Sequence, residues 1–230
     1  MLLSAAVYLY FTDGGLLDFT VMPRFDIGSV FLGIVWAVLV AGMLFRLIPN
    51  KHTAMGARKH FECSFDATPD GVMSEAEMAA AGKRLHKGAF LSALGWVALN
   101  AGIFFMLSAY DILSPAMVIL IVLVYALSDM VCVLFFCPFQ LFFMRNRCCV
   151  TCRIYNWDYA MMCTPFILIP SAYSLSLLLL SVAVLLRWET ALLKNPRFFM
   201  EETNENLSCN RCEERLCRSH DRTHAGRSKI

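Results

Sequence analysis

Six of the ten cysteines fall in two short polar segments, and their spacing is the strongest chemical signal in the sequence. A C-x-x-C turn can direct two thiolates at one ion, and two such turns complete a tetrahedral four-sulfur site. We therefore predict a thiolate-ligated centre that holds zinc, iron or an iron–sulfur cluster. The predicted ligands are Cys149/Cys152 and Cys209/Cys212, with Cys148 and Cys217 as spare or alternative ligands.

Three other interpretations of these cysteines stay open. Cys209, Cys212 and Cys217 could form a local zinc site with His220, which needs no partner loop. C-x-x-C pairs also act as dithiol/disulfide redox centres. The cysteines could equally be free thiols in a reducing cytosol. Spacing this loose does not separate zinc from an iron–sulfur cluster, and the ferredoxin pattern C-x₂-C-x₂-C is absent.

Asp129 is an ionisable residue inside a long apolar stretch, where a carboxylate is costly and usually faces the interior of a helix bundle. On one helix, Cys132 and Gln140 fall on the same face as Asp129, and Asn100 of another stretch is a candidate partner. We predict that Asp129 and Cys132 act in a proton relay, a substrate site or a buried cation site. The alternative is a polar clasp that joins helices by hydrogen bonds.

The composition places these residues in a membrane. Of 230 residues, 58% are hydrophobic and 17% are charged, whereas a soluble domain has about 25% charged residues. The net charge of +2 gives no reason to expect a nucleic-acid partner. Stretches long enough to cross a bilayer cover residues 28–48, 89–109, 116–144 and 159–186, and a short half-span covers residues 1–11. The predicted fold class is all-α, a polytopic transmembrane helical bundle.

The distribution of Lys and Arg predicts the side of each loop, because cytoplasmic loops are enriched in both. Loops 49–87 and 145–158 are basic and are predicted to be cytoplasmic. One crossing by residues 159–186 would place the tail outside, yet the tail holds nine of the 20 Lys and Arg residues. A re-entrant hairpin that turns near Pro170 would return the tail to the cytoplasm. One kinked span is the alternative.

Two domains are predicted, a transmembrane domain over residues 1–186 and a cysteine-rich polar tail over residues 187–230. Within soluble loop 49–87, Ser74 and Glu77 match a capping box and predict a short helix from about Glu75 to His86. The sequence contains no P-loop, dinucleotide fingerprint, zinc-protease motif or nucleophile elbow. Whether the protein is an enzyme therefore stays open.

The segment FFCPFQLFFMRNRCCVTCRIYNWDYAMM, with the later CNRCEERLC, resembles cysteine-rich integral membrane proteins of anaerobic bacteria. The resemblance covers the C-terminal half of the chain. It implies the cytoplasmic membrane of a bacterium and favours an iron–sulfur centre over a redox disulfide. It assigns no activity and no functional residues.

Together these signals predict a membrane protein with a cytoplasmic metal centre that transfers electrons or thiols at the membrane, with Asp129 handling a coupled proton. The alternative is a small transporter or membrane assembly factor with a structural zinc site. The predicted partners are the lipid bilayer and either a redox partner or a second copy of the chain.

Overall fold

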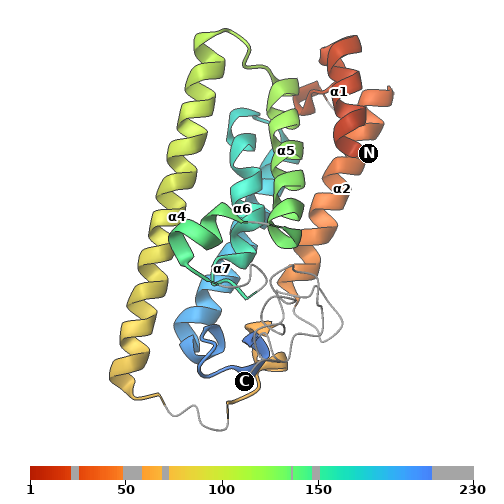
Figure 1. Cartoon of the computed structure of the whole chain (residues 1–230). Helices are drawn as coiled ribbons and strands as arrows, with labels where there is room; N and C mark the ends of the chain where they lie inside the picture. The colour runs from red at the N-terminus through yellow and green to blue at the C-terminus, as the bar shows by residue number, and fades with distance from the viewer. Residues whose placement is uncertain (22–25, 49–58, 69–72, 136, 147–150, 209–230) are drawn as a thin grey trace, which may run out of the picture. The chain divides into compact units, whose positions relative to one another are not determined.

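The computed structural model describes residues 1–21, 26–48, 59–68, 73–135, 137–146 and 151–208. The described residues are helical, apart from loops and one isolated β-bridge between Ala67 and Asn204. The protein is an all-α polytopic bundle, as predicted (Figure 1). Its α-helices are α1 (Leu2–Asp13), α2 (Ile27–Leu47), α4 (Glu75–Ala109), α5 (Pro115–Leu134), α6 (Asp158–Cys163) and α7 (Ala172–Lys194).

Four of these helices, α2, α4, α5 and α7, are long and apolar enough to cross a membrane. The predicted span 28–48 matches α2 to within one residue at each end, and the predicted span 89–109 lies within α4. α4 is longer than predicted, because the helix that starts at the Ser74–Glu77 capping box continues without a break to Ala109. The predicted span 116–144 is too long, since α5 ends at Leu134 and a separate π-helical segment, η4 (Phe139–Met144), follows.

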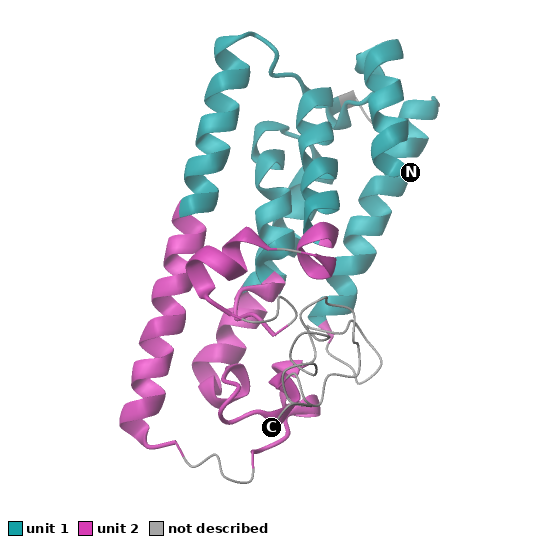
Figure 2. Ribbon diagram, viewed as in Figure 1, with its two compact units in different colours: residues 1–47, 95–129, 157–185 teal, residues 48–94, 130–156, 186–230 magenta. Residues whose placement is uncertain are grey.

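The described chain divides into two compact units (Figure 2). Unit 1 comprises residues 1–47, 95–129 and 157–185, and unit 2 comprises residues 48–94, 130–156 and 186–230. The core of unit 1 is apolar and includes Leu32, Ile119 and Phe166. A hydrogen bond of 2.9 Å from the Trp36 indole to the Ser176 hydroxyl links α2 to α7 inside this core.

Residues 157–185 of unit 1 form a hairpin, not a single kinked helix. The first limb consists of α6 and the 3₁₀ segment η6 (Thr164–Leu168), and the chain turns at residues 169–171 before α7 begins. Ser171 and Ser174 cap the start of α7, because each hydroxyl accepts a hydrogen bond from the other residue's backbone N–H. These bonds fix the start of α7 directly after Pro170, where the sequence predicts a break in the helix.

The two limbs of this hairpin differ in length. α7 has 23 residues, which at about 1.5 Å per residue exceeds the bilayer's hydrocarbon thickness of about 30 Å. The α6–η6 limb has 11 residues and is too short to cross. The chain leaves unit 2 after Asn156 and re-enters it at Leu186. The chain therefore folds back near Pro170, as the predicted hairpin requires. The second limb is longer than predicted, because α7 extends eight residues past the predicted end at 186.

A close approach at the start of α2 generates a prediction for stability. A methyl group on Gly28 would overlap the backbone carbonyl and the Cβ of Leu16, whereas a methyl group on Gly33 of the same helix would meet no atom within 4 Å. We expect Gly28→Ala to lower the free energy of unfolding by about 1–3 kcal/mol, because backbone must move to admit the methyl group. Thermal unfolding in detergent measures the change. Gly33→Ala is the matched control and should leave the Tm unchanged or slightly raised; equal effects of the two substitutions would contradict the packing at Gly28.

Candidate functional site

The structure describes one of the six predicted metal ligands. Cys148, Cys149, Cys209, Cys212 and Cys217 lie outside the described residues. Cys152 is a free thiol and is only 2% exposed, in the core of unit 2. Burial raises the pKa of the Cys152 thiol to about 11, so at neutral pH it is a protonated thiol and not a thiolate. Among the described residues, no group of three His, Cys, Asp or Glu side chains is arranged to hold a metal.

Unit 2 brings together three chain segments, of which the second and third flank the two cysteine clusters. The first is residues 59–64, the second is residues 151–156, and the third is residues 186–208. His60 is fully buried at the centre, and its Nε2 lies 3.3 Å from the carbonyl oxygen of Thr151. Its ring packs against Trp188 and Phe199 of the third segment, at centroid distances of 4.8 and 4.9 Å. His60 therefore lies in an aromatic core that joins all three segments.

Asn204 and Asn206 fix the last described stretch of the chain to the first segment. The fully buried Asn204 donates from Nδ2 to the carbonyl oxygens of Lys59 and Phe198, both at 2.9 Å. Asn206 donates from Nδ2 to the carbonyl oxygen of Ser64. A side-chain amide that satisfies buried backbone carbonyls specifies one position of the chain. The chain that leads into Cys209 is thereby held on residues 59–64, the same segment whose His60 contacts Thr151.

A buried ion pair closes the base of the hairpin. The Arg153 guanidinium donates to both carboxylate oxygens of Glu189, at 3.0 and 2.6 Å. The Arg153 side chain is 2% exposed and that of Glu189 is 27% exposed. The Trp188 indole N–H donates to the carbonyl oxygen of Arg153 at 2.6 Å. Bidentate Arg–carboxylate pairs impose orientation as well as attraction, so residues 151–156 and the end of α7 are locked together.

The polar stripe predicted around Asp129 is interrupted. Asp129 and Cys132 both lie on α5, but the helix ends at Leu134, and Gln140 belongs to η4. The Gln140 side chain donates to the carbonyl oxygen of Asn146 at 2.9 Å. Asn100, the predicted partner of Asp129, instead accepts a hydrogen bond of 3.1 Å from the Tyr125 hydroxyl. The predicted stripe assumed one continuous helix from Asp129 to Gln140. Helical periodicity no longer relates these residues, because the helix ends before Pro138.

Unit 1 contains a charged cluster that sequence reasoning missed. Arg46, in the last turn of α2, pairs with Asp158 at 2.6 Å, and both side chains are 11% exposed. The guanidinium also lies 4.7 Å from the ring centroid of Tyr159, a cation–π contact. Asp158 accepts a further bond from the backbone N–H of Tyr159 at 2.8 Å. The cluster fixes the start of α6 to the end of α2. The sequence contained one indication of this pair, since Arg46 lies near the end of one apolar stretch and Asp158 lies just before the start of another.

The features described above cannot be compared with those of a known family. No protein-family model, no curated protein and no solved structure matches the chain. The functional inference therefore depends on the chemistry and placement of the residues described above.

The Arg153–Glu189 pair predicts a large effect of removing one charge. We expect Glu189→Gln to lower the free energy of unfolding by about 3 kcal/mol, because the buried guanidinium then lacks its counter-charge. Denaturant or thermal unfolding in detergent measures the loss. Glu62→Gln is the matched control, since Glu62 is exposed in the 3₁₀ segment Glu62–Ser64 of the same unit, and it should change stability by less than about 0.5 kcal/mol. A loss in Glu189→Gln no larger than in this control would show that the pair does not hold the two segments together.

The burial of Cys152 predicts slow alkylation. In the native protein at neutral pH, iodoacetamide should modify the exposed Cys63 and spare Cys152, because only an accessible thiolate reacts. Modification of Cys152 should increase as the pH approaches its pKa of about 11. Peptide mass mapping after timed alkylation measures both rates, with denatured protein as the control for full reactivity. Equal rates at Cys63 and Cys152 at neutral pH would contradict the buried placement.

Proposed function

We propose that this membrane protein carries one thiolate-ligated iron–sulfur or iron centre at the surface of unit 2 and transfers electrons there. Its ligands are the three tail cysteines Cys209, Cys212 and Cys217 and one of the adjacent pair Cys148 and Cys149. Four thiolates are the usual donor set for iron–sulfur clusters and for single tetrahedral iron.

The observation that supports a shared centre is the common core formed around residues 59–64. Thr151, the first described residue after the CCVTC cysteines Cys148 and Cys149, contacts His60. Asn204 and Asn206, which precede the tail cysteines, bond to Lys59 and Ser64. Both cysteine segments therefore emerge from one compact unit, as a single centre requires. Residues 49–87 and 145–156 of this unit are rich in Lys and Arg, which favours a cytoplasmic position.

The burial of Cys152 supports a ligand set without it. A thiol that is 2% exposed in a packed core would have to leave that core to reach an ion outside it, and the vacated volume would cost stability. The tail spacing C-x₂-C-x₄-C already provides three thiolates. One cysteine from the 148–149 pair completes four ligands without disturbing the core.

The contacts that already hold residues 186–208 in place favour electron transfer over a purely structural role for the metal. Residues 186–208 are held by the Arg153–Glu189 pair, the His60 aromatic contacts and the two asparagines. A metal is therefore not required to attach this part of the tail. Asp129 and Cys132 on α5 retain their proposed role in moving a proton that accompanies the electron.

The test is metal analysis and visible spectroscopy of the full-length protein after anaerobic purification. We expect about one centre per chain and a visible absorption that bleaches with dithionite. Cys209→Ser and Cys212→Ser should lose the metal and the colour, because each removes a ligand. Cys152→Ser should retain both, and Cys63→Ser is the control for replacing a cysteine elsewhere in unit 2.

Other results would overturn parts of the proposal. Stoichiometric zinc without colour would exclude electron transfer and leave the structural zinc alternative. Loss of the metal in Cys152→Ser, with folding intact by thermal unfolding, would restore Cys152 to the ligand set. Metal retained in both Cys148→Ser and Cys149→Ser would place the whole site in the tail. No metal after anaerobic purification would exclude the centre.

A further inference from the structure

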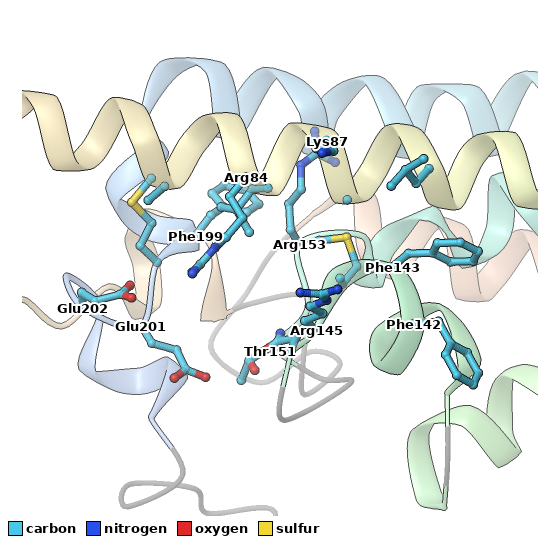
Figure 3. Close-up of a pocket in the computed structure, with 17 residues that line it drawn as sticks. Arg84, Lys87, Phe142, Phe143, Arg145, Thr151, Arg153, Phe199, Glu201 and Glu202 are labelled. Atoms are coloured by element: carbon cyan, nitrogen blue, oxygen red, sulfur yellow. The ribbon is translucent and has the colours of Figure 1, made fainter.

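Unit 2 contains a cavity of about 720 Å³, and among the residues that the structure describes neither a cysteine nor Asp129 lines it. Four parts of the unit form it: one face of α4, the end of η4 with Arg145 and Asn146, the segment with Thr151 and Arg153, and the turn after Phe199. Figure 3 shows Arg84 and Lys87 on α4, with Arg145 and Thr151 across the pocket from the helix and Glu201 and Glu202 toward one end. The cavity is large enough to hold a small organic group with part of an attached chain.

Cations outnumber carboxylates in this cavity. Arg84, Lys87, Arg145 and Arg153 line it, against Glu201 and Glu202. Arg153 is neutralised by Glu189. Within the part of the chain that the structure describes, Arg84, Lys87 and Arg145 form no ion pair. After the Arg153–Glu189 pair is set aside, three cations face the two carboxylates Glu201 and Glu202, so the lining keeps a net positive charge and favours an anionic group.

The backbone brings these cations together at some cost. Arg145 has φ 51°, in the left-handed region that non-glycine residues seldom adopt. Gly88 lets η4 approach α4 closely, since a Cβ there would lie 2.9 Å from the Met144 sulfur and 3.0 Å from the Phe143 carbonyl oxygen. The short approach places Arg145 opposite Arg84 and Lys87, which are three residues apart and share one face of α4.

Most of the remaining lining residues are apolar and suit the start of a hydrocarbon chain. Leu91, Phe142 and Phe143 line the cavity, and the last two lie at the end away from the carboxylates (Figure 3). Arg84 and Lys87 directly precede the apolar part of α4. Basic side chains at this position on a spanning helix lie at the depth of lipid head groups.

We propose that this cavity binds a phosphate group through Arg84, Lys87 and Arg145, and that its apolar end accommodates the hydrocarbon of an anionic phospholipid. The phosphate oxygens accept hydrogen bonds from the two guanidinium groups and the ammonium group. Thr151 supplies a hydroxyl in the same lining. A free phosphate ester offers the same oxygens without the hydrocarbon, and the experiment separates the two sources.

The test compares the full-length protein in phosphatidylcholine vesicles with and without phosphatidylglycerol, and separately with added inorganic phosphate. The readouts are the ligand-dependent shift in Tm and the lipid retained after purification, identified by mass spectrometry. We expect phosphatidylglycerol to raise the Tm and to be retained. Arg84→Gln and Arg145→Gln should each weaken this binding by about fivefold, as expected for one basic residue at an anionic membrane surface.

Lys83→Gln is the matched control, because Lys83 is an exposed cation beside Arg84 that does not line the cavity. It should bind phosphatidylglycerol like the unmodified protein, and Arg84→Lys should retain most of the binding. Comparing shifts, not absolute Tm values, keeps the test valid if a variant is less stable. A Tm shift with inorganic phosphate alone, lost in Arg84→Gln, would support the site and assign it to a soluble phosphate compound. Equal shifts in Arg84→Gln, Arg145→Gln and Lys83→Gln, or no shift with either probe, would overturn the proposal.

Discussion

The pairing of Arg153 with Glu189 is the interaction on which the arrangement of unit 2 depends. It joins the chain just before the hairpin to the end of α7, and the Trp188 indole bonds to the Arg153 carbonyl beside it. With the base of the hairpin closed, Trp188 and Phe199 can pack against His60. A guanidinium that is almost fully buried requires a counter-charge, so the hairpin cannot open at its base without leaving a charge unpaired in the core.

Four arginines of the described chain serve two physical roles. The buried Arg153 and the half-buried Arg46 pair with Glu189 and Asp158, so each fixes one chain segment to another. Arg84 and Arg145 are exposed and line a cavity with Lys87. The first kind of arginine contributes to the fold, because removing a partner leaves an uncompensated charge. The second kind contributes little to the fold, so replacing either residue should cost little stability.

The proposed metal centre and the proposed phosphate site share unit 2 but use different residues. The metal centre needs the cysteines of the 148–149 pair and of the tail. The phosphate site needs Arg84 and Lys87 on α4 and Arg145 directly after η4. A substitution in one site therefore leaves the other chemically intact. Should both be present, unit 2 would combine a redox centre with a contact to lipid head groups, which suits a protein that exchanges electrons at a membrane surface.

Much of the bundle was determined by local sequence. Apolar runs of about 20 residues form spanning helices because unpaired backbone groups are too costly in hydrocarbon, and Pro170 with Ser171 and Ser174 ends one helix and starts the next. The capping box at Ser74 correctly marked the start of α4, although its length was underestimated because no residue after His86 stops the helix. The end of α5 at Leu134 was missed, since the apolar residues continue past it.

The candidate sites depended on contacts that no local pattern contains. Spacing alone placed Cys152 among the metal ligands, but the core formed by segments distant in sequence buries its side chain. Likewise, Arg46 pairs with Asp158, which lies 112 residues away in the sequence. The cavity arises only when Gly88 admits η4 against α4. Sequence determines which segments must leave water, because that depends on composition and run length. The tertiary structure decides which charges meet and which thiols are buried, because those outcomes depend on distances between remote parts of the chain.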